Sequence, residues 1–243
     1  MIFAAGLGIR LKPLTDNIPK ALVEVSGKPL LEHAINKLQQ YGYSDIIINV
    51  YHFAGQLKEF LKQKNNFGIR IELSDESEQL LDTGGGLKKA AWFFNDNKPF
   101  LVHNVDVLSD IDLNALYQLH MQGNSLATLA VRQRDTSRYF LFDEQLYLCG
   151  WKNNETGELK ISKGNAGTLT PLAFSGIQIV NPEIFKLINE NGKFSMTGVY
   201  LRLAASNRVK GFMHDSGYWF DLGKPESIKE AEVILNEKDH LYE

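Results

Sequence analysis

Strand-like and helix-like patterns of apolar residues alternate over the first half of the chain. The β-branched run at residues 46–50 predicts a buried strand, and residues 69–73 predict another. Apolar residues recur at helical spacing from Pro29, a favoured first helical position, to a stop at Gly42, and again over residues 57–61. This alternation predicts an α/β fold with a Rossmann-like, doubly wound, mostly parallel sheet and helices on both faces. Ligands of such sheets bind outside the carboxyl ends of the strands.

The second half continues with further strands and helices. Strands are predicted at residues 100–107, 126–131 and 209–214, and helices at 113–119, 182–188, 197–205 and 224–236. Two apolar runs flank Asp143-Glu144-Gln145, which predicts a hairpin, and a polar, glycine-bearing loop is expected over residues 152–170. We therefore expect one domain over residues 1–243, with a small β-hairpin and loop insertion.

Composition narrows the class of protein. With 243 residues, 44% apolar and 23% charged, the chain resembles ordinary globular proteins. A net charge of −3 gives no reason to expect nucleic acid or an anionic membrane as partner, and no apolar run approaches the roughly 20 residues of a membrane span. The single cysteine, Cys149, excludes an internal disulfide, fits a cytoplasmic location, and is predicted to be unreactive.

The first twenty residues are the strongest candidate for ligand binding. A short apolar run leads into a loop with Gly6 and Gly8, and Arg10, Lys12 and Lys20 follow. Glycines let the backbone approach a bulky anion with N–H groups turned toward it, and the cations suit a triphosphate. Taken alone, the loop leaves open an ordinary turn with surface cations. The chain starts almost inside the strand, which leaves open whether residues precede Met1.

Two commoner phosphate motifs are excluded. A dinucleotide fingerprint needs a third glycine where Leu11 stands. A P-loop needs Gly-x-x-x-x-Gly-Lys-Ser/Thr, but Gly27-Lys28 is followed by Pro29, and position 22 is Leu.

The stretch instead resembles the signature of the sugar-1-phosphate nucleotidyltransferases, Leu-Ala-Ala-Gly-x-Gly-x-Arg-(Leu/Met)-x-Pro-Leu-Thr and then Pro-Lys. The chain reads Phe3-Ala4-Ala5-Gly6-Leu7-Gly8-Ile9-Arg10-Leu11-Lys12-Pro13-Leu14-Thr15, and then Pro19-Lys20. The pattern is most similar to N-acetylmuramate-1-phosphate uridylyltransferases and mannose-1-phosphate guanylyltransferases. The resemblance implies a nucleotide-binding part over residues 1–125 and a sugar-binding part over 126–223. It implies nucleotide contacts at Ala4, Ala5, Gly6, Gly8, Glu76 and Gly85.

A second motif, Asp82-Thr83-Gly84-Gly85-Gly86, resembles the Glu-Thr-Gly-Gly-Gly of the same two groups. We expect a flexible glycine entry in front of a helix that forms a wall for the nucleobase. Glu76, Glu78 or a backbone pair on Gly85 would read the base, and this choice stays open. A carboxylate accepts two hydrogen bonds from guanine and one from uracil, which gives a slight preference for GTP over UTP.

Two aspartates resemble the metal ligands of the family. Asp106 follows an apolar strand, as in the family's Asn-Gly-Asp, although Val105 replaces the customary glycine. Asp221 lies in Trp219-Phe220-Asp221-Leu222-Gly223, which resembles Trp-x-Asp-x-Gly. Each aspartate alone is as readily a helix cap or a solvated residue; together they imply a Mg²⁺ ion. His103 is predicted to be a strand histidine and not a ligand.

The resemblance also implies a sugar site and a reaction. Glu-Lys-Pro of hexose-specific relatives is missing, whereas Phe174-Ser175-Gly176-Ile177 resembles the muramyl and mannosyl types. The implied sugar contacts are Asn104, Arg138, Asn165, Gly167 and Thr168. The acceptor phosphate would attack the α-phosphorus of the triphosphate and expel pyrophosphate. Arg10 would hold the β- and γ-phosphates, and Lys20 would lie by the α-phosphate and the sugar phosphate.

The expected partners are a nucleoside triphosphate and a hexose-type or heptose-type 1-phosphate, in the synthesis of nucleotide sugars for cell-envelope polysaccharide by a monomer or homodimer. Two alternatives stay open. A phosphocholine cytidylyltransferase shares the fold and signature but takes a cationic acceptor. A catalytically silent regulatory homologue would bind nucleotide sugar without turnover, although it would be free to lose Arg10, Lys20, Asp106 and Asp221.

Overall fold

The chain folds into two compact units, each built from segments that are separate in sequence. The computed structural model describes the backbone of residues 1–239 and the side chains of residues 1–235. The first unit comprises Met1–Leu80, His103–Asp110 and the segment from Tyr218 onward, and the second comprises Leu81–Val102 and Ile111–Gly217. Both units therefore draw on each half of the chain, and their boundaries differ from the expected parts 1–125 and 126–223.

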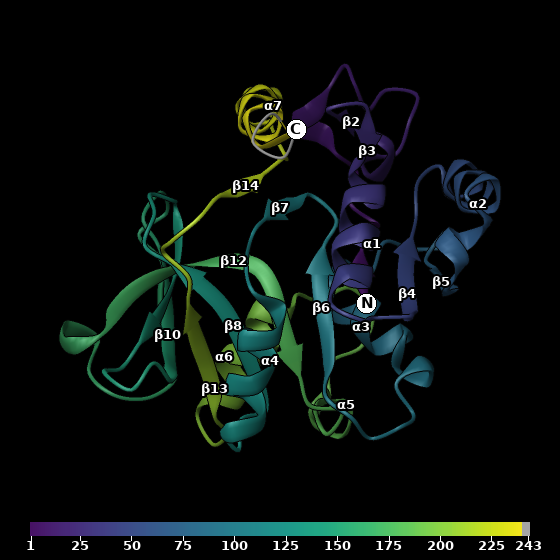
Figure 1. Ribbon diagram of the computed structural model, residues 1–243. Helices are drawn as coiled ribbons and strands as arrows, with labels where there is room; N and C mark the ends of the chain where they lie inside the picture. The colour runs from purple at the N-terminus through teal and green to yellow at the C-terminus, as the bar shows by residue number, and fades with distance from the viewer. Residues whose placement is uncertain (240–243) are drawn as a thin grey trace. The chain divides into compact units, whose positions relative to one another are not determined.

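The first unit contains the parallel sheet that the sequence predicted. Its strands follow the order β6-β1-β4-β5, and all three pairings are parallel. Figure 1 labels β4, β5 and β6 and the helices α1 and α2. The elements are β1 (Ile2–Phe3), α1 (Leu30–Gln40), β4 (Asp45–Val50), α2 (Ala54–Gln63), β5 (Arg70–Asp75) and β6 (Phe100–Asn104), with short 3₁₀ turns at Ile9–Leu11, Lys20–Leu22 and Asn65–Gly68. Strand β6 is divided, since only His103 and Asn104 belong to this unit.

The apolar patterns explain these elements. Residues 46–50 of β4 are all buried, and α1 buries the apolar face predicted from its spacing. Pro29 is the residue before the helix and not its first residue, because it still belongs to a strand. Gly42 has a φ of 82°, a left-handed conformation that glycine adopts without strain just after a helix.

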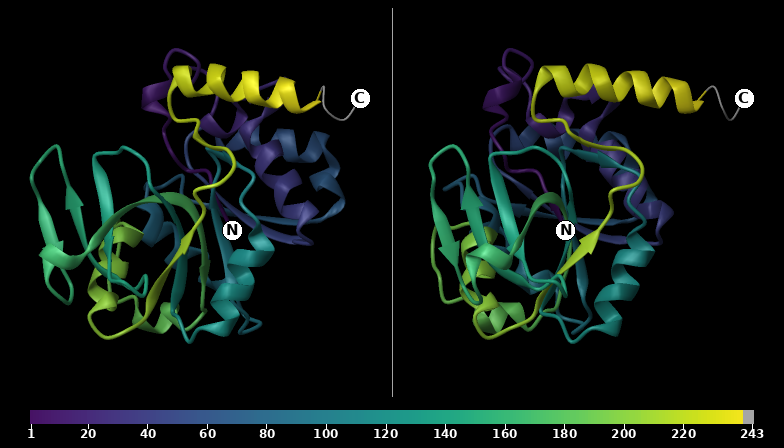
Figure 2. Two further views of the ribbon diagram at one scale, coloured as in Figure 1. Left: turned by 60° about the vertical axis from the view of Figure 1, so that its left-hand side comes forward. Right: turned by 90° about the vertical axis from the view of Figure 1, so that its left-hand side faces the viewer.

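Shorter strands and the last helix complete the first unit. Strand β2 (Glu24–Val25) pairs antiparallel with β3 (Lys28–Pro29), and β7 (Val107–Ser109) pairs antiparallel with β14 (Trp219–Asp221). Helix α7 (Pro225–Asp239) lies beside the N-terminal segment, as Figure 2 shows. The Ser26 N–H donates to Glu232 Oε1 at 3.3 Å, which joins this helix to the β2–β3 hairpin.

The second unit is mainly antiparallel. Strands β11, β10, β9 and β12 follow one another in an antiparallel ladder, and β8 pairs antiparallel with β12 and parallel with β13. The elements are α3 (Asp82–Lys89), α4 (Leu113–Gln122), β8 (Ala127–Arg132), β9 (Arg138–Phe142), β10 (Leu148–Asn153), β11 (Leu159–Ile161), β12 (Thr170–Val180), α5 (Ile184–Leu187), α6 (Met196–Ala204) and β13 (Val209–Met213), with 3₁₀ turns at Ala91–Phe93 and Ala166–Thr168.

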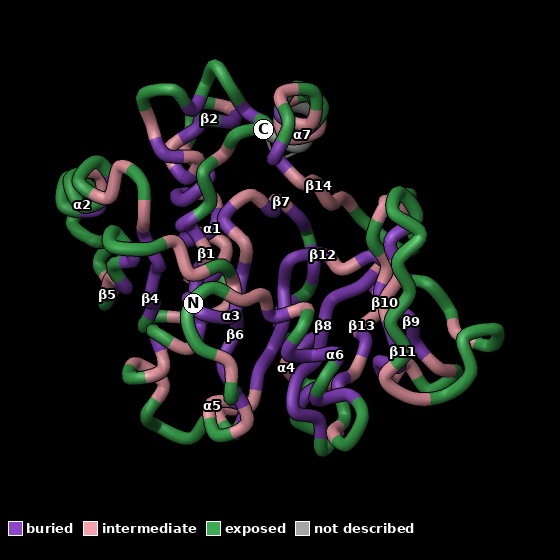
Figure 3. Tube along the Cα trace, turned by 180° about the vertical axis from the view of Figure 1, so that it is seen from behind, coloured by how far each residue is buried: buried purple, intermediate pink, exposed green. Residues whose placement is uncertain are grey.

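The predicted α/β fold is confirmed as a mixed fold with a largely parallel sheet flanked by helices. The β9–β10 hairpin around residues 143–145 is also confirmed. It is not a small insertion, because β9 continues into the ladder with β12 and makes the hairpin part of the second unit's sheet. The loop expected over 152–170 contains β11, whose three residues are exposed, whereas β8 is largely buried, as the colours of Figure 3 show. Among the described residues, no helix combines the length and apolar character needed to span a membrane.

Candidate functional site

The loop that follows β1 is fixed at both ends by hydrogen bonds within the first unit. At its start, the Ala4 N–H donates to Asn49 Oδ1 at 2.7 Å. At its end, the Gly8 carbonyl accepts from Thr15 Oγ1 at 2.9 Å. Gly8 has a φ of 65°, and a Cβ there would lie 2.8 Å from Thr15 Cγ2, so this position requires glycine. We call residues 4–8 the glycine loop.

The middle of the glycine loop is open. Gly6 is exposed, its φ lies outside the left-handed region, and a Cβ built on it would meet no atom within 4 Å. The protein itself therefore does not demand glycine here, but a bulky ligand close to the backbone would. Ala4 and Ala5 are buried. The Ala4 N–H already donates to Asn49 Oδ1, so Ala4 belongs to the part of the loop that is anchored to the sheet.

Lys20 and Asp106 form an ion pair just beyond the carboxyl end of β6. Their side chains are only 12% and 18% exposed. Asp106 lies in a turn between β6 and β7, so the prediction of one strand over 100–107 is wrong in this detail. The Val105 N–H still donates to the Phe3 carbonyl at 3.0 Å, and the chain turns at residues 105–106 before it pairs with β14 through β7.

The β7–β14 ladder brings the second aspartate to the same place. Asp221 lies opposite Val107, the residue after Asp106. The Leu222 N–H donates to the Asp106 carbonyl at 2.8 Å. Two aspartates that are far apart in sequence thus become neighbours through a short antiparallel pairing.

Arg10 reaches Asp221 from the end of the glycine loop. Its Nη2 lies 3.9 Å from Asp221 Oδ2, and both side chains are well exposed. A Cβ at Gly223 would lie 2.5 Å from Arg10 Nη2 and 2.7 Å from Asp221 Oδ1. Gly223 therefore leaves the space that the pair occupies, and its N–H donates to Asp221 Oδ1 at 3.0 Å.

The structure thus brings together the four charged residues that the sequence singled out. An exposed ion pair such as that of Arg10 contributes little to stability, so folding does not explain its placement. Asn104 is the last residue of β6 and lies opposite Phe3 in β1, next to the start of the glycine loop. This arrangement offers two cations, two carboxylates and an open loop backbone within one unit.

Glu76, a candidate base contact, is buried in the first unit. It has no exposed surface, and its Oε1 accepts a hydrogen bond from Asn49 Nδ2 at 2.8 Å. Glu78, two residues on, is exposed. A base contact by either glutamate stays a prediction. Asn49 was not among the predicted site residues. The feature that could have identified it is a single polar residue inside the apolar run of β4.

The sequence predicted that the three glycines at 84–86 form a flexible entry in front of a helix. This prediction is wrong, because the glycines lie within α3. A Cβ at Gly84 would collide with the Phe194 ring and lie 2.9 Å from the Phe194 carbonyl oxygen. A Cβ at Gly85 would collide with the Gly192 carbonyl oxygen. The N–H groups of Gly84 and Gly85 donate to the Phe194 carbonyl at 2.9 and 3.2 Å. Close packing on the segment before α6 therefore accounts for Gly84 and Gly85.

The predicted sugar contacts other than Asn104 lie in the second unit. Asn165, Gly167 and Thr168 form an exposed 3₁₀ turn in which Asn165 Oδ1 accepts from the Gly167 N–H at 3.0 Å. Arg138 begins β9 and lines a cavity of about 640 Å³. The other residues around it are Asp82, Thr83, Trp151, Asn153, Glu158, Lys160, Ser195, Thr197, Gly198 and Leu201.

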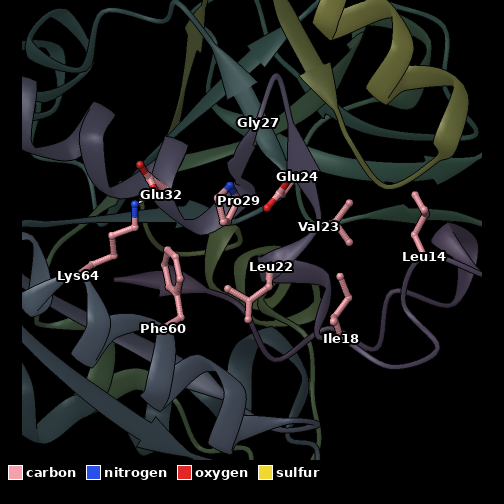
Figure 4. A pocket seen from close by; sticks show the side chains of 10 residues that line it. All are labelled: Leu14, Ile18, Leu22, Val23, Glu24, Gly27, Pro29, Glu32, Phe60 and Lys64. Atoms are coloured by element: carbon pink, nitrogen blue, oxygen red, sulfur yellow. Dashed lines mark ion pairs between the residues drawn. The ribbon is translucent and has the colours of Figure 1, made fainter.

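Another cavity of about 640 Å³ lies in the first unit, at the β2–β3 hairpin, the start of α1 and the end of α2. Figure 4 shows that most of its lining side chains are apolar and that the Lys64 amino group faces Glu32. These two groups form an ion pair with 3.0 Å between Lys64 Nζ and Glu32 Oε2. Because the Lys64 amino group is already paired with Glu32, this cavity is a poor binding site for a triphosphate.

Two residues expected to be inert are buried. His103 lies in β6, where its Nδ1 is 2.7 Å from the Asn104 carbonyl, and burial lowers its pKa to about 4. It is a strand histidine, as predicted. Cys149 lies within β10, and burial raises the pKa of its thiol, which disfavours the reactive thiolate.

The chain is similar to known proteins over nearly its whole length. Residues 1–238 match the family described as nucleotidyl transferase. The chain is 33% identical over 249 residues to the N-acetylmuramate alpha-1-phosphate uridylyltransferase of Caulobacter vibrioides, covering 98% of this chain and 96% of that protein. It is 32% identical over 237 residues to the mannose-1-phosphate guanyltransferase of Yarrowia lipolytica, covering 94% and 61%.

A solved structure supports the fold. The CTP:phosphocholine cytidylyltransferase of Streptococcus pneumoniae aligns with a TM-score of 0.72 at 21% identity, covering 96% of this chain and 97% of that one. At this identity the likeness concerns the fold alone. The family match and the 33% identity extend over nearly the whole chain, and the chain therefore belongs to the nucleotidyl transferase family.

Proposed function

We propose that the protein is a sugar-1-phosphate nucleotidyltransferase, which makes a nucleotide sugar and pyrophosphate from a nucleoside triphosphate and a sugar 1-phosphate. The observation that carries this proposal is the grouping of Lys20, Asp106, Arg10 and Asp221 beside the open glycine loop. Proteins named for this reaction are among the chain's relatives.

The chemistry needs positioning and charge more than proton transfer. An oxygen of the sugar phosphate attacks the α-phosphorus, the bond to the bridging oxygen of the β-phosphate breaks, and pyrophosphate leaves. The attacking oxygen is already anionic at neutral pH, so no general base is required. The obstacle is the approach of two polyanions, which preorganised cations reduce. We expect Lys20 to face the α-phosphate and the sugar phosphate, and Arg10 to face the leaving phosphates.

The residues at the site fit a magnesium ion. Mg²⁺ in nucleotide enzymes is commonly bound by one or two carboxylates together with substrate phosphates and water. Asp106 and Asp221 supply two neighbouring carboxylates, and among the described side chains no group of three or more His, Cys, Asp and Glu forms a denser metal site. When bound, the ion would neutralise phosphate charge and help to orient the reacting groups. Lys20 and Arg10 pair with the same two carboxylates and would add to the positive charge around the phosphates.

We infer a uridine or guanosine donor, with UTP now preferred. The preference for GTP rested on an accessible carboxylate, and Glu76 is fully buried against Asn49. That argument now rests on Glu78 alone. The relative that aligns over nearly its whole length is named for uridylyl transfer to N-acetylmuramate 1-phosphate, and this sugar phosphate is the first acceptor to test.

A matrix of four triphosphates against several sugar 1-phosphates and phosphocholine, read by pyrophosphate release, tests the proposal. We expect release with UTP or GTP and a sugar 1-phosphate, dependent on Mg²⁺. Release with CTP and phosphocholine alone would overturn the acceptor class, and nucleotide-sugar binding without release would favour the regulatory alternative.

The metal ligands are tested in the same assay. Asp106→Asn and Asp221→Asn remove one anionic oxygen each at little steric cost, so we expect folded protein with most turnover lost. Full Mg²⁺-dependent activity in either variant would contradict the assignment.

A further inference from the structure

We propose that Asn49 and Glu76 position the glycine loop for the triphosphate, with Glu76 acting through the Asn49 amide. This inference rests on the proposed function only for the identity of the ligand. Neither residue is placed to touch the ligand, so both are positioning residues.

The three groups form one buried chain of hydrogen bonds. Glu76 Oε1 accepts from Asn49 Nδ2 at 2.8 Å, and Asn49 Oδ1 accepts from the Ala4 N–H at 2.7 Å. Asn49 is 3% exposed and Glu76 has no exposed surface. Water therefore does not compete with these bonds, and a buried polar group without its partner is costly.

Glu76 determines which way the Asn49 amide points. The two ends of a carboxamide have nearly the same shape, but one only donates and the other only accepts. Glu76 Oε1 accepts from the Nδ2 end of the Asn49 amide. This leaves Oδ1 as the acceptor for the Ala4 N–H.

The anchored amide fixes the point where the chain leaves the sheet. Ala4 directly follows β1, whose Phe3 pairs with Asn49 in β4 and with Asn104 in β6. The other end of the loop is held by Thr15 on the Gly8 carbonyl. Between the anchors lies Gly6, with open space around it. A rigid loop loses less conformational freedom when a ligand binds, so the anchors raise affinity without contacting the ligand.

A reversed pair of side chains tests the proposal. Asn49→Asp alone places two carboxylates within hydrogen-bond reach and displaces the anchor. Glu76→Gln alone keeps an acceptor for Asn49 Nδ2 at the same place. In the double variant Asn49→Asp/Glu76→Gln, the introduced glutamine donates to the introduced aspartate, which still accepts from Ala4.

Hydrogen exchange at the Ala4 amide and the KM for the triphosphate are the two readouts. We expect Asn49→Asp to accelerate exchange and raise KM about tenfold or more, which corresponds to the loss of one buried hydrogen bond. Glu76→Gln and the double variant should stay within about threefold of the parent chain, since each keeps the hydrogen-bond chain complete. Glu76→Gln should leave the ratio of GTP to UTP activity unchanged.

Thr128→Val is the matched control. It breaks a buried contact of the second unit, between Thr128 Oγ1 and His120 Nδ1 at 2.9 Å, and should lower the melting temperature without changing KM. If Asn49→Asp behaves like this control, with unchanged KM and Ala4 exchange, the proposal is wrong. If Asn49→Asp does not fold, recovery of folding and KM in the double variant supports the proposal, and failure to recover overturns it.

The test separates this inference from the proposed function. If the parent chain releases no pyrophosphate with any substrate pair, the proposed function fails. Ala4 exchange and calorimetric binding of UTP and GTP then still decide whether Asn49 and Glu76 position the loop.

Discussion

The chain has two glycine-rich segments that look alike in sequence and differ in their surroundings. In the glycine loop of the first unit, a Cβ at Gly6 would meet nothing within 4 Å. In the first turn of α3 in the second unit, a Cβ at Gly84 or Gly85 would run into the segment that contains Gly192 and Phe194. One segment is open, and the other is filled by the protein itself.

The difference shows that glycine in a motif has two separate physical causes. A glycine with open space around it leaves room for something outside the chain. A glycine under a neighbouring ring and carbonyl is needed for the fold. Substitutions in the two units should therefore separate loss of activity from loss of stability.

The largest effect is expected at Lys20. Lys20→Ala removes a cation from the place where charge develops, so we expect kcat to fall by about 10²–10³-fold. Arg10→Ala should mainly raise KM, because phosphates bound equally before and during the reaction affect KM and not kcat. Steady-state kinetics with UTP and GTP measure both. If Lys20→Ala changed KM and left kcat unchanged, the proposed position of Lys20 beside the reacting phosphates would be wrong. Lys58→Ala is the control, since Lys58 forms an exposed pair with Asp75.

The second unit should respond through stability. Gly84→Ala overpacks α3 against Phe194, which typically costs about 1–3 kcal/mol and outweighs the helix-propensity gain of about 1 kcal/mol from alanine. Gly55→Ala is the matched control, because Gly55 lies in α2 with nothing within 4 Å of its Cβ position and should gain up to about 1 kcal/mol. Urea denaturation midpoints compare the two. Equal midpoints would mean that the packing at Gly84 does not require glycine.

Gly6→Ala should have the opposite profile. The substitution meets no protein atom and no left-handed φ, so the free energy of unfolding should hardly change. A methyl group where phosphate approaches the backbone should raise the KM for the triphosphate about tenfold, equivalent to about 1.4 kcal/mol. An unchanged KM would show that the ligand does not use the open space at Gly6. The two glycine segments would then not differ in the way proposed here.

The sequence predicted the first unit better than the second, for a physical reason. Parallel strands buried on both faces, such as β4, have long apolar runs that can be recognised locally. The N-terminal motif predicted Arg10 and Lys20 because it is contiguous. By contrast, the helical position of Gly84 depends on Phe194, more than a hundred residues away, and no local pattern contains that contact.

Long-range partners also explain what was missed at the site. Asn49 stood out only as one polar residue in an apolar strand, and its role depends on Glu76 and Ala4, which directly follow the strands β5 and β1. Asp106 was expected at a strand end, but the turn before β7 depends on the pairing with β14.

The smallest expected effect is a pH dependence that both units share. Burial lowers the pKa of His103 in the first unit and of His120 in the second to about 4, below the ordinary value of 6.5. Between pH 6.5 and pH 4 the unfolded chain binds more protons than the folded one, so the free energy of unfolding falls as the pH falls through this window. Each histidine should lower the free energy of unfolding at pH 5.5 by about 1 kcal/mol relative to pH 7.5. Asn at position 120 can still hydrogen-bond to Thr128 but cannot gain charge, so His120→Asn should make the decline between pH 7.5 and 5.5 smaller by about 1 kcal/mol. Urea midpoints at these two pH values measure it, and an equally steep decline in the variant would assign the acid sensitivity to the first unit alone.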